Sequence, residues 1–231
     1  MVSSIVVLLT TFSSHAYQNH DKQQVKVVDV LAVEYPPFTT SQVAGNGIAM
    51  SAFYQRFNEP QIKWRPQFVP PARAYYLIEK GDWCVSFYPI PDNILSTKIT
   101  LSEQVIRIGL IRLKSEKQKS SVFEWQTLTE LSPASVAILR TGVNSVFIQR
   151  FQQANLKPVF VENVTSARYM LQYGRVDYAM LDNVSFENLP ELEQQNIEFS
   201  LSSLIETPIT VFVNPKCQLN LEISEDTQSN K

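Results

Sequence analysis

The chain has 231 residues, of which 44% are hydrophobic and 18% are charged, and its formal net charge is -2. A chain of this length and composition can bury a substantial core, either as one large domain or as two smaller lobes. The near-neutral balance gives no electrostatic footprint for nucleic acid or for an anionic membrane surface. Thirteen prolines against six glycines favour fixed turns over flexible linkers.

The N-terminal residues contain a short apolar run, Ile5 to Phe12, followed by Ser14-His15-Ala16. The run is too short to span a bilayer, which takes about 20 residues. The small-x-small triplet is typical of a secretory processing site, although no basic residue precedes the run. We therefore predict a signal peptide over residues 1–16, with a buried N-terminal strand as the alternative, and no transmembrane span in the mature chain.

Strand and helix signals then alternate along the chain. Val25 to Val33 is a β-favouring run that suits a strand covered on both faces. The elements predicted after it are a helix over 47–57, a strand over 62–68, a helix that begins at Pro70-Pro71 and ends at Gly81, and a strand over 83–88. This order predicts parallel pairing and a layered α/β domain.

The extended apolar run Ile106 to Leu113 is predicted to leave that first layered unit. After a polar loop the alternation restarts with a helix near Thr127, a strand over 136–139, a helix over 143–154 and a strand over 158–161, and Pro208 to Val213 forms a return strand. A chain that leaves one α/β lobe, builds another and returns has two strands crossing the boundary. Such inter-lobe clefts bind small ligands and close by hinge motion.

The stretch from Thr165 to Asp182 combines a helix, a turn and a strand. Thr165 or Ser166 can cap the helix, and Gly174 suits the left-handed position after its end. The apolar run from Val176 to Leu181 is typical of a buried strand. Asp182 follows directly, and ligands of open α/β sheets bind beyond the carboxyl ends of strands.

Four motifs occur in the order that one family shows, namely Tyr35-Pro36-Pro37-Phe38-Thr39, Arg73-Ala74 with Gly81-Asp82, Leu139-Arg140-Thr141-Gly142, and Gly174-Arg175-Val176-Asp177. With them, the chain resembles the periplasmic solute-binding proteins of the amino-acid type (extracellular solute-binding protein family 3) over roughly residues 25 to 215. The resemblance implies a type II two-lobe α/β fold in which two crossing strands join the lobes. Lobe 1 would comprise residues 25–107 and 207–217, lobe 2 residues 108–206, and a polar tail residues 218–231.

Family members usually continue after the return strand with helices that pack on lobe 1. Here the segment from Lys216 to Lys231 is polar and has no amphipathic period. We therefore expect the C-terminal helices to be missing and lobe 1 to lack part of its cover, as in a truncated or frameshifted relative of marginal stability.

The resemblance also implies a set of ligand-binding residues in lobe 2. Asp182 matches an aspartate that pairs with a substrate ammonium, and such a contact is a charge-assisted hydrogen bond; an aspartate that only caps a turn is the alternative. The turn that contains Thr141, Gly142 and Asn144 would open a helix whose free N–H groups can hold a carboxylate.

In lobe 1, Tyr35 and Phe38 would form aromatic walls of the cleft, or else pack as ordinary core residues. Arg73 lies in the first turn of its helix, where a cation is unfavourable unless an anion is near. The family's amino-acid binders carry a carboxylate-binding arginine at the position of Ile94, and isoleucine cannot replace its fork of donors. The ligand is therefore left unnamed.

The chain has two cysteines, Cys84 and Cys217. In the family-like topology both would lie in lobe 1, and export to an oxidising compartment would permit a disulfide between them; two unpaired thiols are the alternative. His15 and His20 add no ligand cluster, so neither a metal nor another cofactor is predicted.

The first functional hypothesis is a periplasmic, non-enzymatic protein that captures a small polar solute, either amino-acid-like or an organic acid. Capture would serve ABC-type uptake or sensing, with a membrane transporter or sensor as the partner. A module that no longer binds a ligand and serves sensing or partner binding is the first alternative. A dehydratase-type enzyme on the same scaffold is the second, and Glu34 would be its only candidate acid or base near Asp182.

Overall fold

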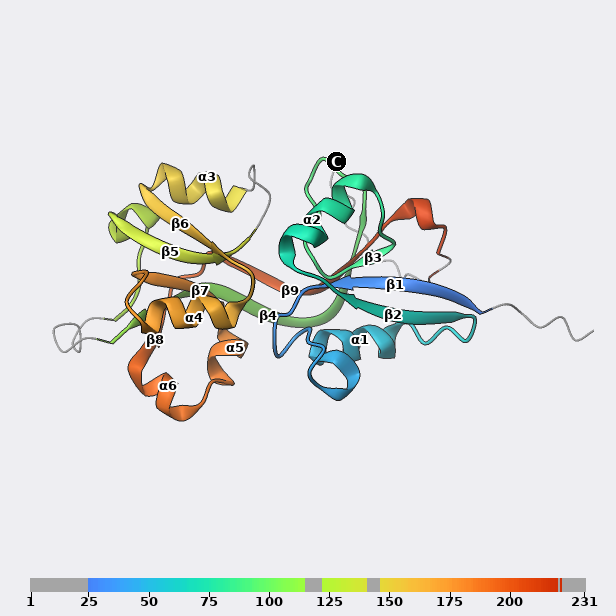
Figure 1. Cartoon of the computed structure of the whole chain (residues 1–231), viewed down its shortest axis with the longest axis horizontal. Coiled ribbons are helices and arrows are strands. Elements are labelled where there is room, and N and C mark those ends of the chain that lie inside the picture. Colours follow the sequence, from blue (N-terminus) through green and yellow to red (C-terminus); the bar gives the residue numbers. More distant parts are fainter. Residues whose placement is uncertain (1–24, 115–121, 141–145, 220, 222–231) are drawn as a thin grey trace, which may run out of the picture.

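The computed structural model describes residues 25–114, 122–140, 146–219 and 221. Two groups of helices and strands lie at opposite ends of the molecule (Figure 1). The long strand β4 (Thr97–Leu113) and strand β9 (Ile205–Val213) run through both groups and join them. The predicted two-lobe α/β arrangement with two crossing strands is therefore confirmed, whereas the exact lobe boundaries stay a prediction.

Lobe 1 is built on strand β1, which lies between β2 and β3 and runs parallel to both. The elements of this lobe are β1 (Lys26–Ala32), η1 (Ala44–Asn46), α1 (Ile48–Arg56), β2 (Ile62–Phe68), α2 (Pro71–Lys80) and β3 (Val85–Ser86). Val28 and Val30 pack with Phe53 of α1, whereas Leu31 packs with Leu77 of α2. Alternate residues of β1 therefore contact helices on opposite faces of the sheet, as the period of a strand requires.

Lobe 2 repeats this plan around strand β5, which lies between β6 and β7 and is parallel to both. Its elements are η3 (Leu128–Leu131), β5 (Ala134–Leu139), α3 (Val146–Gln153), β6 (Leu156–Val161), α4 (Val164–Gln172), β7 (Tyr178–Asp182), α5 (Asn183–Glu187), α6 (Glu191–Asn196) and β8 (Ile197–Phe199). Val136 and Ile138 pack with Phe151 of α3, and Ala137 packs with Leu171 of α4. The two faces of this sheet are thus covered by α3 and α4.

The strands of both lobes form one continuous sheet in the order β2-β1-β3-β9-β4-β7-β5-β6, and β8 pairs with β4. Strands β4 and β9 are antiparallel from Thr97 opposite Val213 to Ile108 opposite Ile205. Their register is irregular between Thr100 and Val105, shortly before the predicted boundary between the lobes.

Three local predictions need correction. Asn163, rather than Thr165 or Ser166, caps helix α4, because its side-chain oxygen accepts a hydrogen bond from the Ser166 N–H at 2.8 Å. The strand expected over 83–88 is only the two residues of β3, since Tyr88 and its neighbours already turn toward the other lobe. The helix near Thr127 is the short 3-10 turn η3.

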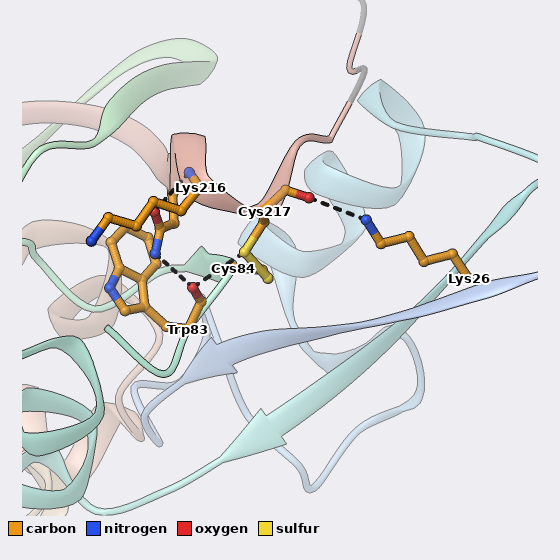
Figure 2. The surroundings of a disulfide bond; sticks show 6 residues. Lys26, Trp83, Cys84, Lys216 and Cys217 are labelled. Carbon is orange, nitrogen blue, oxygen red and sulfur yellow. Dashed lines mark hydrogen bonds between the residues drawn. A yellow bond between two sulfur atoms is a disulfide. The ribbon is translucent and has the colours of Figure 1, made fainter. Parts of the chain in front are cut away.

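The chain beyond β9 is joined to lobe 1 by a disulfide between Cys84 and Cys217 (Figure 2). Cys217 belongs to the 3-10 turn η4 (Pro215–Cys217), and its carbonyl accepts a hydrogen bond from Lys26 at 3.1 Å. The Asn214 side chain donates to the carbonyl of Trp83 at 2.9 Å. Three contacts therefore hold this segment against β1 and β3.

Candidate functional site

The carboxylate of Asp182 lies at the boundary between the lobes. Asp182 is the last residue of β7 and also the N-cap of helix α5, and it is only 1% exposed. One oxygen, Oδ1, accepts a hydrogen bond from the Ser185 N–H at 2.7 Å. The other, Oδ2, is buried and has no hydrogen-bond partner among the described residues. The side chain thus caps a helix with one oxygen, while the second oxygen has no well-aligned donor among the described residues.

Burial dominates the electrostatics of this group. Burial raises the pKa of Asp182, and the hydrogen bonds from Ser185 and the nearby Tyr35 hydroxyl oppose this effect without cancelling it. The neighbouring phenol belongs to Tyr35, whose pKa is raised well above its usual value by burial and by the charge of Asp182. A buried carboxylate with a free acceptor is costly unless a donor or a cation satisfies it.

Tyr35 belongs to a tight corner that follows β1. Its N–H donates to the carbonyl of Thr39 at 2.7 Å, and the Pro36–Pro37 peptide bond is cis. The centroid of the Tyr35 ring lies 5.9 Å from that of the Phe38 ring. Phe38 is buried in an apolar cluster with Ile106 of β4, and Val184 of α5 packs against that cluster. The structure therefore brings Tyr35, Phe38 and Asp182 together at the boundary.

Two side-chain hydroxyl groups donate hydrogen bonds across the same boundary. The Ser185 hydroxyl donates to the carbonyl of Pro36 at 3.0 Å, and the Tyr88 hydroxyl donates to the carbonyl of Arg140 at 3.0 Å. Burial raises the pKa of Tyr88 to about 12, so its hydroxyl keeps its proton at neutral pH. Sequence reasoning missed Ser185 and Tyr88. The pattern Asp182-x-x-Ser185 is typical of a capped helix start and could have located the first.

Other predicted site residues lie elsewhere. Arg73 is on the exposed side of α2, with its guanidinium 5.1 Å from the centre of the Tyr76 ring. Ile94 is partly buried against the apolar cluster that includes Leu31 and Leu77. Thr141, Gly142 and Asn144 lie outside the described residues. The anion seat predicted at that turn therefore stays a prediction.

Glu34, the candidate acid or base of the enzyme alternative, accepts a hydrogen bond from the Ser41 N–H at 2.9 Å. Partial burial acts to raise its pKa, but the hydrogen bonds from Ser41 and Thr40 outweigh it and lower the pKa. A carboxyl of lowered pKa is ionised at neutral pH and is not poised as a general acid. No group of three potential metal ligands occurs in the described part of the chain.

Comparisons with known proteins show the fold. No protein-family model and no curated protein sequence matches this chain. Among solved structures, an arginine-bound mutant of ArgBP from T. maritima is 14% identical with a TM-score of 0.63, and the match covers 83% of this chain and 89% of that one. The substrate-binding protein of an amino acid ABC transporter is 14% identical with a TM-score of 0.61, covering 81% and 85%.

The GluR0 ligand-binding core from Nostoc punctiforme, solved with L-glutamate, is 12% identical with a TM-score of 0.57, and the match covers 81% of this chain and 84% of that one. At such identities the likeness concerns the fold. The chain has the two-lobe type II fold of these amino-acid-binding proteins, so the resemblance identified in the sequence is confirmed at that level. None of the helices in the described ranges is long and apolar enough to cross a membrane.

Proposed function

We propose that the chain is a solute-binding protein that captures a small solute carrying a positive charge, with Asp182 as its partner at the lobe boundary. The observation that carries this proposal is the buried Oδ2 of Asp182, which has no hydrogen-bond partner among the described residues. An ammonium group would supply both the missing donor and the countercharge, as a charge-assisted hydrogen bond. Tyr35 and Phe38 would enclose its apolar part.

The described residues favour recognition of a positively charged group over recognition of an α-carboxylate. The place of the carboxylate-binding arginine in amino-acid binders is taken by Ile94, which packs into lobe 1. Arg73 stacks on Tyr76 at the surface of α2. A carboxylate of the solute would therefore depend on Arg73 turning toward the boundary or on the turn with Thr141, Gly142 and Asn144. An amine without a carboxylate needs neither.

The proposed setting is the periplasm, with uptake through an ABC-type transporter or signalling through a membrane sensor as the purpose of capture. The support is the shared fold with the substrate-binding protein of an amino acid ABC transporter and with the GluR0 ligand-binding core. The same proposal includes a signal peptide over residues 1–16 and a role in binding without catalysis.

The test is calorimetric titration with matched pairs of solutes in which only one member carries an ammonium group, such as ethanolamine and ethylene glycol, or propylamine and 1-propanol. We expect the charged member of a pair to bind and the neutral member not to bind. In Asp182→Asn the affinity should fall roughly 10- to 100-fold, because a hydrogen bond to a charged group contributes about 1.5–3 kcal/mol.

Asp92→Asn is the matched control, because Asp92 is exposed and this substitution removes one negative charge from lobe 1. It should leave the affinity unchanged. Equal binding of charged and neutral members, or an Asp182→Asn variant that binds as tightly as the wild type, would contradict the proposal.

One observation favours a second candidate, a sensing or partner-binding module that responds to no solute. The two lobes already touch through side chains of the chain itself, at Ser185 and Pro36 and at Tyr88 and Arg140. A complete lack of response to both charged and neutral solutes, in a protein that folds cooperatively, would support this candidate.

A further inference from the structure

Three residues of lobe 1, namely Tyr35, Pro36 and Tyr88, contact lobe 2 directly in the absence of a solute. Tyr35 packs against the lobe 2 cluster that contains Ala137, Leu171 and Leu181, and also against the lobe 1 cluster that contains Leu31. Tyr35 is thus shared by the cores of both lobes. A side chain in this position contributes its burial only when the lobes are together.

The corner that carries Tyr35 is fixed to helix α5 by a directed contact. The Ser185 hydroxyl donates to the carbonyl of Pro36, while the Ser185 N–H donates to Oδ1 of Asp182. One residue of α5 therefore holds both the corner of lobe 1 and the candidate site carboxylate of lobe 2. Val184 adds apolar contact with the cluster of Phe38.

Tyr88 makes a second, separate connection. It follows β3 in lobe 1, is 6% exposed, and donates its hydroxyl proton to the carbonyl of Arg140 at the end of β5 in lobe 2. Because the two hydrogen bonds join different pairs of segments, together they resist both separation and twisting of the lobes.

The corner of Tyr35 also lies against Asp182. With 1% of its surface exposed, this residue is out of reach of a solute in the conformation described. A solute that uses Oδ2 must therefore enter while the lobes are apart or while Tyr35 is displaced.

We infer that the corner of Tyr35 and Pro36, together with Tyr88, forms a latch that closes the lobes in the absence of solute and shields Asp182. A solute then competes with the latch for the boundary. The affinity part of this inference rests on the proposed function, whereas the closure part does not.

The inference has a quantitative consequence for binding. When only a fraction of molecules can accept a ligand, the observed dissociation constant is the intrinsic one divided by that fraction. Removing one latch hydrogen bond enlarges the fraction. Since such a bond contributes about 0.5–1.5 kcal/mol, each removal should tighten binding by roughly 2- to 12-fold.

The closure part is tested by small-angle X-ray scattering of the full chain without any solute. The wild type should match the arrangement of the two lobes in Figure 1. The double variant Tyr88→Phe/Ser185→Ala, which removes the two hydroxyl groups that donate across the boundary, should show a larger radius of gyration. The control Tyr76→Phe/Ser203→Ala removes two hydroxyl groups from within single lobes and should scatter like the wild type; Ser203 contacts Glu206 nearby.

A wild type that is already extended, or a double variant that scatters like the control, would overturn the inference. Circular dichroism of each variant separates opening from unfolding. For any amine found to bind, the double variant should bind more tightly than the control, and weaker binding would likewise overturn the shielding role. A closed protein that binds no amine would leave the latch standing and refute the proposed function alone.

Discussion

The two lobes share a plan but differ in how completely they cover their sheets. In lobe 2, β5 is buried on both faces, with Ala137 and Ile138 at 0% and 1% exposure, and α4 is joined to α6 by the ion pair of Arg168 with Glu193 at 2.8 Å. In lobe 1, the start of β1 is open, and Val27 is 51% exposed. Lobe 2 is thus stabilised by packing, whereas lobe 1 adds a covalent link at the open end of its sheet.

The lobes also differ in the groups that they bring to their common boundary. Lobe 2 contributes a buried carboxylate, Asp182, whereas the described part of lobe 1 contributes the hydroxyl groups of Tyr35 and Tyr88 and the apolar ring of Phe38. A buried carboxylate at this boundary is suited to a cation. Each of the following experiments changes one lobe and asks whether the difference between them persists.

The largest effect is expected from the disulfide of lobe 1. Cys84 and Cys217 are separated by 133 residues, and closing a loop of that length stabilises a fold by about 4–5 kcal/mol in the chain-entropy model. The variant Cys84→Ala/Cys217→Ala should therefore lose about that much free energy of unfolding, measured by urea denaturation.

Hydrogen exchange locates the effect of the same variant. Amides of β1 and β3 should lose protection before those of β5 and β6, because the link fastens the chain end to lobe 1. Wild-type protein treated with dithiothreitol should behave in the same way. An unchanged denaturation midpoint, or equal loss of protection in both lobes, would remove the distinction between them.

A smaller effect of opposite sign is expected in lobe 2. Burial raises the pKa of Asp182 above its ordinary value of 3.8, so the folded state binds this proton more tightly than the unfolded state. The carboxyl therefore favours folding less as the pH rises from 3.8 through its raised pKa. Asp182→Asn should increase the free energy of unfolding by about 1 kcal/mol at pH 7, because it removes a buried charge.

The gain should shrink as the pH falls toward 3.8, which thermal melts at a series of pH values can follow. Asp92→Asn serves again as the control for the loss of one exposed carboxylate. If Asp182→Asn is less stable than the wild type at pH 7, then hydrogen bonds stabilise the ionised carboxylate by more than its burial costs.

The smallest effect is expected for Arg73 of lobe 1. Its guanidinium stacks on the exposed Tyr76 ring, so Arg73→Ala should change stability by about 0.5 kcal/mol or less. We expect the affinity for an amine without a carboxylate to stay the same in this variant. A selective loss of affinity for carboxylate-bearing solutes would instead show that Arg73 turns toward the boundary and would reduce the charge difference between the lobes.

The sequence by itself determined the local elements and their order. Val25 to Val33 predicted β1, the Pro70-Pro71 pair and Gly81 bounded α2, and Gly174, with a φ of 63°, ends the turn after α4 as its lack of a side chain permits. These signals are short in range, since they depend on backbone preference and on the period of apolar residues. The alternation of strands and helices was enough to predict two layered lobes joined by two strands.

Only the tertiary structure decided what meets at the boundary. Asp182 was identified from its place after a strand. Its roles as helix cap and as buried boundary carboxylate, however, depend on Ser185 and on the corner at Tyr35, about 150 residues away along the chain. The contact of Tyr88 with Arg140 has no local signal, because nothing in either segment encodes its partner. Such contacts arise when distant segments are placed by the packing of whole elements, which no sequence pattern of short period records.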